Sequence, residues 1–257
     1  MKISSVWVIG KKGLEDSVEN FKHVAKRYFN LKDKRPDIVA TIGGEGTVFR
    51  AVKEYPNSVV LPFRKLSFGA LSQLDESDAL MALEKIKKGE YVVENIMRLE
   101  IKYKGLKAWG INDVCVLRDD ENANRFRVFS DNEDVYGNEL MGDGVIGATP
   151  YGSTGYNWTA GGPILNRNES RFVITPVCSA YFNQRLVIEN RNVMKKAEES
   201  KIFPDNKEVV IKFSRDIRNK IVPDGRQEER VYVDIKAGDK VIIRKSKENS
   251  KLLRILQ

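Results

Sequence analysis

The stretch Asp37–Val52, DIVATIGGEGTVFRAV, runs from an apolar segment through two glycines into residues that favour a helix. The apolar half has the composition of a buried strand, and residues from about 47 to 55 have the spacing of a short helix. A glycine pair between a strand and a helix is typical of the turn at the carboxyl end of a parallel strand. This stretch therefore predicts one strand, turn and helix unit of an α/β layer.

The residues on either side repeat this alternation. Two apolar runs, 2–10 and 58–63, are strand-like, whereas 17–29 and 78–88 place their apolar residues at helical spacing. Strands that are separated by helices pair in parallel, because the helix carries the chain back across the sheet. Residues 1–92 are therefore predicted to form an α/β domain of the Rossmann-like kind.

The pattern changes after Tyr91. Short β-branched and aromatic runs follow one another with almost no helical periodicity, broken by Gly, Asn, Asp and Pro. They lie at residues 92–119, 125–131, 144–149, 171–177, 185–190, 207–214 and 239–246. These runs predict an all-β, sandwich-like domain over residues 93–246. The last segment, 247–257, stands apart from them and is predicted to pack back on the first domain.

Composition narrows the class of ligand. Of the 257 residues, 44 are basic and 36 acidic, which gives a net charge of +8 and a surface that attracts anions. The basic residues form no stripe interleaved with aromatics, so phosphorylated small molecules are favoured over nucleic acid. The N-terminal apolar run is too short for a signal peptide or a membrane span, which predicts a cytoplasmic protein without a membrane partner. Cys115 and Cys178 lie in apolar runs and are predicted to be buried free thiols.

A second glycine-rich stretch, Gly142–Pro163, reads GDGVIGATPYGSTGYNWTAGGP and holds seven glycines. Glycine lets main-chain N–H groups approach phosphates and sugars without an obstructing Cβ. Ser153, Thr154 and Thr159 add short hydroxyls that donate or accept hydrogen bonds. Together with the turn Gly43–Thr47, in which a carboxylate stands among glycines, this stretch indicates a kinase that acts on a nucleotide.

Taken in order, the motifs of this chain resemble those of the NAD kinase family. They are GGEGT at 43–47, INDV at 111–114, DGVIGATPYGSTGYNWTAGGPI at 143–164, ITPV at 174–177, PDGR at 223–226 and IKAGDKVII at 235–243. The resemblance covers most of the chain. It implies an N-terminal α/β domain, a C-terminal β-sandwich domain, an active site between them, and a homo-oligomer, either a dimer or a tetramer.

The same resemblance implies the reaction. The terminal phosphoryl group of ATP, or of inorganic polyphosphate, is expected to pass to the 2′-hydroxyl on the adenosine ribose of NAD, giving NADP, with Mg²⁺ as the divalent cation that bridges the donor phosphates. Two alternatives stay open. One is a lipid or sugar kinase with a similar glycine turn, although such kinases lack the TPYGSTGYNWTAGGP segment. The other is a non-catalytic sensor of NAD or NADP, which the glutamate at position 45 favours.

The resemblance also assigns roles to residues. Glu45 stands where the family has an aspartate and is the predicted catalytic proton acceptor. The residues implied to bind NAD are Gly44, Gly46, Thr47, Asn112, Asp113, Asp143, Thr154, Gly155, Tyr156 and Thr159. The donor phosphates are assigned to Gly43, Gly44, Arg64 and Lys65, and no metal ligand is assigned. Among the NAD-binding residues, Asn112 and Asp113 are expected at ribose hydroxyls, and Asp143 at the nicotinamide end.

Several positions depart from the family pattern. Glu45 replaces an aspartate and Asp113 replaces a glutamate, so one carboxylate reaches further and the other less far; we hypothesise that the two changes compensate for each other. The segment 61–74, LPFRKLSFGALSQL, lacks the family's asparagine, and Arg64 and Lys65 are expected to supply replacement charge. SAYF at 179–182 lacks the family's histidine near the new phosphate.

Overall fold

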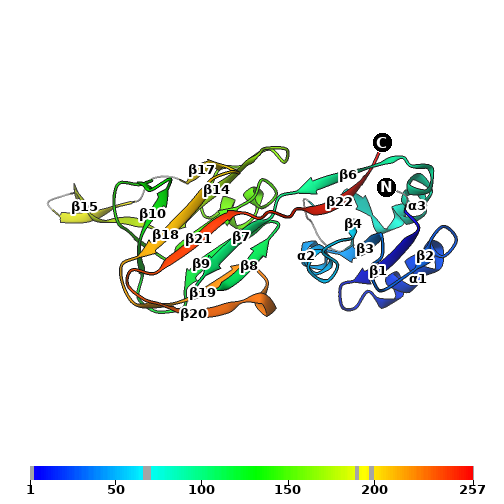
Figure 1. The fold of residues 1–257 in the computed structure, drawn as a ribbon, viewed down its shortest axis with the longest axis horizontal. Helices are drawn as coiled ribbons and strands as arrows, with labels where there is room; N and C mark the ends of the chain where they lie inside the picture. The colour runs from blue at the N-terminus through cyan, green and yellow to red at the C-terminus, as the bar shows by residue number, and fades with distance from the viewer. Residues whose placement is uncertain (1–2, 66–70, 189–190, 197–199, 257) are drawn as a thin grey trace. The chain divides into compact units, whose positions relative to one another are not determined.

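The computed structural model of the chain describes residues 3–65, 71–188, 191–196 and 200–256 (Figure 1). The chain forms two compact units. Unit 1 contains the residues up to Ile96 and those from Asn249 onward, and unit 2 contains Met97–Glu248. The division after Ile96 lies a few residues beyond the sequence-based boundary at 92. In the described part of the chain, no helix is long and apolar enough to cross a membrane.

Unit 1 is built on one sheet of mostly parallel strands. Its order is β2, β1, β3, β4, β22 and β6, with β5 paired to β4. Only the contact between β22 and β6 is antiparallel. The strands are β1 (Ser5–Gly10), β2 (Asn30–Leu31), β3 (Ile38–Gly43), β4 (Val59–Arg64), β5 (Leu74–Asp75), β6 (Tyr91–Ile96) and β22 (Ser250–Ile255). The carboxyl ends of β3 and β4 therefore lie side by side, with Gly43 opposite Arg64.

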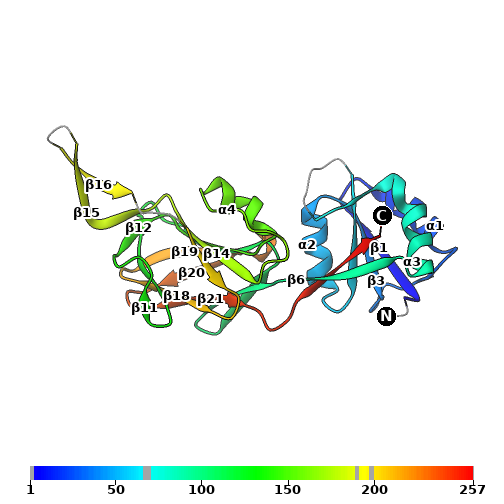
Figure 2. The same ribbon diagram turned by 90° about the horizontal axis from the view of Figure 1, so that it is seen from above.

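Helices cover both faces of this sheet. Figure 2 shows α1 (Glu15–Ala25) and α3 (Ala79–Lys88) on one face and α2 (Glu45–Glu54) on the other. The helix predicted over 17–29 ends at Ala25, because the chain then turns to bury Phe29 in the core. A short 3-10 helix, η1 (Glu76–Asp78), precedes α3. The predicted α/β class of this half is confirmed.

Unit 2 consists of two antiparallel sheets, named here the large sheet and the small sheet. In the described residues the large sheet runs β16, β15, β12, β10, β18, β21, β7 and β8, with β11 paired to β10. The small sheet runs β17, β14, β13, β9, β19 and β20. All of these neighbouring strands are antiparallel, which confirms the predicted all-β class.

The bounds of these elements follow the apolar runs of the sequence. The large sheet contains β7 (Leu99–Tyr103), β8 (Leu106–Gly110), β10 (Asn124–Ser130), β11 (Glu133–Asp134), β12 (Leu140–Gly142), β15 (Ala180–Ile188), β16 (Arg191–Lys196), β18 (Glu208–Phe213) and β21 (Lys240–Lys245). The small sheet contains β9 (Asp113–Arg118), β13 (Gly144–Ala148), β14 (Arg171–Val177), β17 (Lys201–Pro204), β19 (Ile217–Pro223) and β20 (Val231–Ile235). Three short helices complete the unit: η2 (Gly152–Thr154), α4 (Tyr156–Thr159) and η3 (Gln227–Glu229). The run predicted at 185–190 ends at positions 189–190, outside the described residues.

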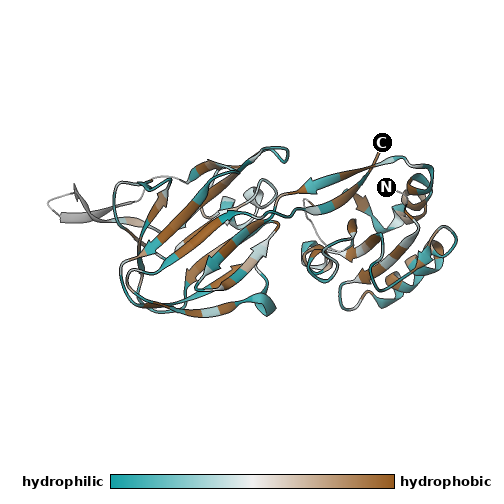
Figure 3. Cartoon of the chain, viewed as in Figure 1, coloured by the Kyte–Doolittle hydropathy of each residue, from teal (hydrophilic) through white to brown (hydrophobic). Residues whose placement is uncertain are grey.

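The two sheets of unit 2 pack face to face around one apolar core. Alternate residues of both sheets meet there, such as Phe126 and Ile211 from the large sheet and Val114 and Phe172 from the small sheet. Figure 3 shows the corresponding concentration of hydrophobic residues along the strands. The outer face of the small sheet is also buried over β9, β13 and β14, because Leu165 and neighbouring residues of the glycine-rich stretch cover it there. These three strands therefore need apolar residues on both faces.

The two cysteines differ in exposure. Cys115 is buried on the outer face of β9, as predicted, but Cys178 is exposed. The prediction for Cys178 was wrong because the strand β14 ends at Val177, and Cys178 adopts a left-handed backbone conformation with φ 47° in the turn to β15. An apolar sequence run thus extended past the end of its buried strand.

The C-terminal segment adds a strand that the sequence did not identify. Residues of β22 pair with β4 and β6 in unit 1. The buried Arg254 fixes this strand, because its guanidinium donates to Glu94 at 2.8 Å and to the carbonyl of Leu71 at 2.7 Å. Leu252, Leu253 and Arg254 are buried in succession, so the segment lacks the alternation of apolar and polar residues that marks a strand in a sequence.

On the outer face of the large sheet, one buried carboxylate holds three cations. Glu100 is 1% exposed and pairs with Lys102 at 3.1 Å, Lys107 at 2.7 Å and Arg244 at 2.7 Å. Burial alone raises the pKa of Glu100, but the hydrogen bonds from Lys107, Arg244 and Lys102 outweigh it and lower the pKa from 4.5 to about 2. The folded state therefore stabilises the ionised carboxylate.

We predict that Glu100→Gln lowers the free energy of unfolding by about 1–3 kcal/mol at pH 7, because charge-assisted hydrogen bonds are lost and three cations remain together. Since the folded pKa is depressed, this contribution is present above pH 4.5 and is lost as the pH falls toward 2. Urea unfolding at pH 7 and pH 3 measures both effects. Equal destabilisation at the two pH values would contradict the assignment.

Candidate active site

The turn between β3 and α2 is very short, because β3 ends at Gly43 and α2 begins at Glu45. Gly43 has φ 145°, and a Cβ on it would lie 2.8 Å from the Thr47 hydroxyl oxygen, so only glycine fits without strain. Gly44 is the N-cap residue of α2. The predicted start at about 47 was therefore too late: Glu45, Gly46 and Thr47 form the first helical turn. A helix start presents backbone N–H groups toward solvent and favours anions.

The two cations at the end of β4 already have carboxylate partners. Arg64 forms a two-pronged pair with Asp75, at 2.9 and 3.1 Å. The Lys65 ammonium lies 2.5 Å from Glu76 and 2.6 Å from the Ser17 hydroxyl. The Asp75 carboxylate raises the pKa of Arg64, and the guanidinium lowers that of Asp75. Donor phosphates would have to displace these carboxylates, so the phosphate role of Arg64 and Lys65 stays a prediction.

In unit 2, one carboxylate fixes the backbone that carries Asn112 and Asp113. The buried Asp224 accepts hydrogen bonds from the N–H groups of Ile111 at 3.1 Å, Asn112 at 2.7 Å and Asp113 at 3.2 Å. Its own N–H donates to the Asp113 carbonyl at 3.0 Å. A Cβ on Gly110 would lie 2.6 Å from the Asp224 carboxylate, so glycine is required for this approach. The position of Asn112 therefore depends on Asp224.

The Asn112 side chain itself remains available. Asn112 is 9% exposed, and its Oδ1 atom has no hydrogen-bond partner among the described residues. Its carbonyl accepts from the Thr149 N–H at 2.8 Å, and a Cβ on Gly152 would collide with that carbonyl. The glycine-rich stretch thus rests directly on the Asn112 backbone, while a buried acceptor lacks a protein donor. Buried acceptors without a donor are uncommon, and a ligand is one explanation for them.

The glycine-rich stretch satisfies its own backbone with two buried side chains. The Ser153 hydroxyl donates to the Pro150 carbonyl at 2.7 Å and accepts from the Leu165 N–H at 3.0 Å. The Asn157 amide donates to the carbonyls of Ser153 at 3.1 Å and Pro163 at 2.9 Å. The expectation that Ser153 contacts a ligand was therefore wrong, because this hydroxyl is buried and committed to the loop.

Three other polar side chains of this stretch face solvent. Thr154, Tyr156 and Thr159 are exposed. Partial loss of contact with water raises the pKa of the Tyr156 hydroxyl, and the nearby Cys115, Cys178, Asp143 and Asp113 raise it further. Tyr156 is therefore neutral at pH 7 and can donate a hydrogen bond. Burial and the neighbouring Asp113 likewise raise the pKa of the Cys115 thiol well above its usual range, so this thiol is unreactive.

A hollow of about 590 Å³ joins Tyr156 to Asp143. Its lining is rich in charge and consists of Leu117, Arg118, Asp119, Asp120, Glu121, Asp143, Tyr156 and Lys220. The Asp143 carboxylate accepts from Arg118 at 2.6 Å. Two residues assigned to NAD, from opposite ends of β13 and the loop that follows it, thus line one hollow, and this hollow has more carboxylates than cations.

Comparison with known sequences decides the family. The profile of the ATP-NAD kinase C-terminal domain matches residues 111–255. The NAD kinase of Methanothermobacter thermautotrophicus is 31% identical over 232 residues, which cover 88% of this chain and 74% of that protein. The chain belongs to the NAD kinase family. The NAD kinase of Saccharolobus islandicus is 29% identical over 245 residues, covering 95% of this chain and 90% of that protein.

Solved structures of NAD kinases share the fold. A crystal structure of yeast NADH kinase complexed with NADH matches with a TM-score of 0.79 at 18% identity, covering 100% of this chain and 84% of that one. An NAD kinase from Archaeoglobus fulgidus in complex with ATP matches with a TM-score of 0.75 at 18% identity, covering 98% and 94%. The chain is an NAD kinase enzyme, and the alternative of a lipid or sugar kinase is set aside.

The structure gathers the predicted site residues of this NAD kinase into two sets. Unit 1 holds the set at the carboxyl ends of β3 and β4, which is Gly43, Gly44, Glu45, Gly46, Thr47, Arg64 and Lys65. Unit 2 holds the set around β9 and the glycine-rich stretch, which is Asn112, Asp113, Asp143, Thr154, Gly155, Tyr156 and Thr159. The assignment of each residue to NAD or to the donor stays a prediction.

Sequence reasoning missed the residues that hold these sets in place. Asp224 and Gly225 have the composition of an ordinary turn, and both indeed have positive φ, at 49° and 64°. The signal that sets Asp224 apart is its place in the PDGR motif, which ends β19 next to β9. Asn157 gave no signal of its own. Its role follows from burial, which a single sequence does not reveal.

The residues present suit a cation that is bound mainly by its substrate. Among the described residues, no three Asp, Glu, His or Cys side chains lie close enough to form a metal site. Mg²⁺ is commonly held by one or two carboxylates together with substrate phosphates and water. Glu45, beside the helix start of α2, is a carboxylate that fits this pattern.

We predict that Asp224→Asn lowers the free energy of unfolding by about 1–3 kcal/mol and also weakens NAD binding, because it removes a carboxylate that serves three N–H groups. Asn112→Ala should weaken NAD binding by a similar amount and leave stability nearly unchanged, since its Oδ1 has no protein donor. Calorimetry with NAD and urea unfolding separate the two effects. Unchanged NAD affinity in a folded Asn112→Ala protein would remove this residue from the site.

We predict that Asp75→Asn lowers the KM for ATP about two- to fivefold, because Arg64 no longer has to leave an exposed ion pair to meet the phosphates. Asp216→Asn is the matched control, since it removes one carboxylate from the exposed pair with Lys236 in unit 2. Steady-state kinetics with varied ATP measure the effect. If Asp75→Asn and the control give the same KM, Arg64 takes no part in donor binding.

Proposed function

We propose that this NAD kinase transfers the terminal phosphoryl group of ATP, or of inorganic polyphosphate, to the 2′-hydroxyl of the adenosine ribose of NAD. The products are NADP and ADP, or a polyphosphate shortened by one unit, and one proton is released. The order of the motifs and the ligands of the solved relatives, NADH in one and ATP in the other, support a dinucleotide acceptor and a nucleotide donor.

The observation that carries the proposal is the buried Oδ1 atom of Asn112, which has no donor among the described residues. Asp113 follows Asn112 in the chain, and Asp224 fixes the backbone of both residues. An amide next to a carboxylate offers donors and acceptors to the two hydroxyls of a ribose. A ribose hydroxyl would donate a hydrogen bond to the Asn112 oxygen. An amide oxygen on the surface would need no such donor from a ligand, because water supplies one.

The rim of the glycine-rich stretch suits the rest of the dinucleotide. Thr154, Tyr156 and Thr159 are exposed there, and Asp143 shares a hollow with Tyr156. Glycine at position 155 keeps the backbone between them free of a side chain. We assign Thr154, Gly155, Tyr156 and Thr159 to the adenosine half of NAD and Asp143 to the nicotinamide end.

We assign Glu45 as the group that accepts the proton of the 2′-hydroxyl during the reaction. The 2′-hydroxyl becomes a better nucleophile as its proton leaves, and a carboxylate within hydrogen-bond reach is a suitable acceptor. The Gly43–Gly46 backbone is assigned to the donor phosphates, with Arg64 and Lys65 as further charge. A divalent cation, Mg²⁺ in this proposal, supplies charge neutralisation at the donor phosphates when bound. Positioning and charge stabilisation, more than covalent chemistry, account for catalysis of this kind.

We predict that Glu45→Gln lowers kcat about 10²- to 10⁴-fold, because the amide keeps the shape of the side chain but cannot accept the proton. NAD binding should remain within a few-fold of the parent protein. An NADP-specific dehydrogenase coupled to the reaction measures turnover, and calorimetry measures binding.

Glu45→Asp tests the departure from the family residue. It keeps the charge but withdraws the carboxylate by one methylene, so we expect a smaller loss than for Glu45→Gln. Turnover of Glu45→Gln at the parental rate would reject the proton-acceptor role.

A further inference from the structure

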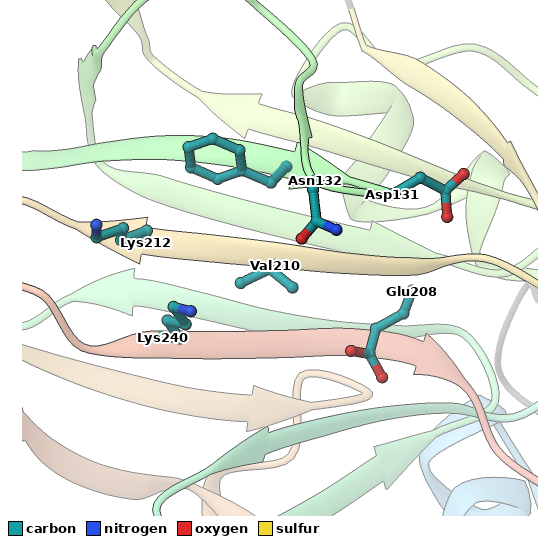
Figure 4. Close-up of a pocket in the computed structure, with 7 residues that line it drawn as sticks. Asp131, Asn132, Glu208, Val210, Lys212 and Lys240 are labelled. Carbon is teal, nitrogen blue, oxygen red and sulfur yellow. The ribbon is translucent and has the colours of Figure 1, made fainter.

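A second pocket lies on the outer face of the large sheet (Figure 4). Its volume is about 400 Å³, within the range of small-molecule sites. The lining residues are Phe129, Asp131, Asn132, Glu208, Val210, Lys212 and Lys240. The apolar core of unit 2 separates this face from the small sheet, which carries Asn112, Asp113 and the glycine-rich stretch. The pocket is therefore distinct from the NAD-binding residues of unit 2.

Two lysines at one end of the pocket oppose each other directly. The register of β18 and β21 pairs Lys212 with Lys240, and the register of β10 and β18 pairs Arg127 with Lys212. Both lysines are exposed, and neither forms an ion pair or hydrogen bond with a described residue. Like charges directly across a pair of strands are destabilising. An anion between the two ammonium groups would turn this repulsion into binding.

The remainder of the pocket combines two hydrophobic side chains with an amide and two carboxylates, Asp131 and Glu208. Phe129 and Val210 are partners in the register of β10 and β18 and are partly buried. Figure 4 shows the Asn132 amide between the lysines and the carboxylate of Glu208. Asn132 sits in a turn with φ 65°, next to Asp131 with φ 51°. The pocket thus passes from a cationic end, over an aromatic floor, to an amide and a carboxylate.

We propose that this pocket binds an adenine nucleotide. Lys212 and Lys240 hold the phosphate, Phe129 and Val210 contact the flat face of the base, and the Asn132 amide pairs with the base edge. An amide side chain can both accept from the exocyclic amino group of adenine and donate to its neighbouring ring nitrogen. Glu208 is a second acceptor at the same end. Stacking of a base on an aromatic ring adds to the binding free energy independently of charge.

The charge of this face disfavours a second copy of the chain as the occupant. Among the described residues, the side chains that point outward from the sheet include more cations than carboxylates. The cations are Lys102, Lys107, Arg125, Arg127, Lys212, Lys240 and Arg244, and the carboxylates are Glu100, Asp134 and Glu208. Two such faces would bring like charges together, which suppresses association. An anionic small molecule fits the same surface.

The test follows the two lysines by NMR. Reductive methylation with ¹³C-formaldehyde labels lysines and keeps their charge, and Lys212→Arg and Lys240→Arg assign the two signals. The protein is titrated separately with adenosine 5′-monophosphate, ribose 5-phosphate and inorganic phosphate, and the two signals report this pocket because Lys212 and Lys240 lie apart from the NAD-binding residues of unit 2. We expect both signals to shift saturably with the nucleotide, with a Kd at least tenfold lower than for inorganic phosphate.

Variants then test the phosphate-binding lysines and the base-binding Asn132 separately. The double variant Lys212→Gln/Lys240→Gln should weaken nucleotide binding at least tenfold, whereas Lys236→Gln/Lys251→Gln, which removes the same charge elsewhere, should not. Asn132→Gly keeps the positive φ of the turn and should weaken binding of the nucleotide but not of ribose 5-phosphate.

Three results would overturn the proposal. Lysine signals that stay fixed in all titrations would show that the pocket binds none of the three ligands. Equal Kd values for inorganic phosphate and the nucleotide would reduce it to a simple anion site. A smaller oligomer for Lys212→Glu than for the parent, by light scattering, would show that this face joins copies of the chain. None of these results bears on the NAD kinase assignment.

Discussion

The carboxylate of Asp224 holds three consecutive backbone N–H groups, and the proposed acceptor site of unit 2 rests on that contact. Backbone N–H groups at the start of a strand must find acceptors when they are buried. Here a side chain supplies them, so the start of β9 does not need another strand. The carbonyl of Asn112 is then left for Thr149, and Gly152 can pack against it without a Cβ. The glycine-rich stretch and the Asn112 side chain are fixed by one interaction.

The small sheet imposes a second constraint, because its strands β9, β13 and β14 are buried on both faces. Val114 faces the core of unit 2, while Cys115 faces the glycine-rich stretch. A loop covers this outer face, so its own polar backbone has to be satisfied without regular structure. Ser153 and Asn157 do this from within, and Thr175 donates to the Asn157 amide oxygen at 2.6 Å. The buried polar residues of the stretch are consequently structural, and only its rim is left for a ligand.

Much of this arrangement could be predicted from the sequence, since strand composition and glycine turns act locally. The change from α/β to all-β and the order of the motifs needed no tertiary information. Pairings across long sequence distances were not predictable. Arg64 pairs with Asp75 and Lys65 pairs with Glu76. Both partners lie about ten residues further along the chain, and no periodicity in the sequence indicates these pairs. The role of Asp224 likewise depends on a register between β9 and β19 that only the folded chain defines.

The position of Glu45 links the fold to the chemistry of phosphoryl transfer. The start of α2 attracts an anion, yet Glu45 places a negative charge on its first residue. A donor phosphate and this carboxylate would repel each other if they approached without a counter-charge. The two cations at the end of β4 are already neutralised, because Asp75 and Glu76 pair with Arg64 and Lys65. The helix start alone is therefore insufficient for a polyphosphate chain. Either those ion pairs open as the donor binds, or a divalent cation arrives with the donor, and the second route leaves the ion pairs of unit 1 intact.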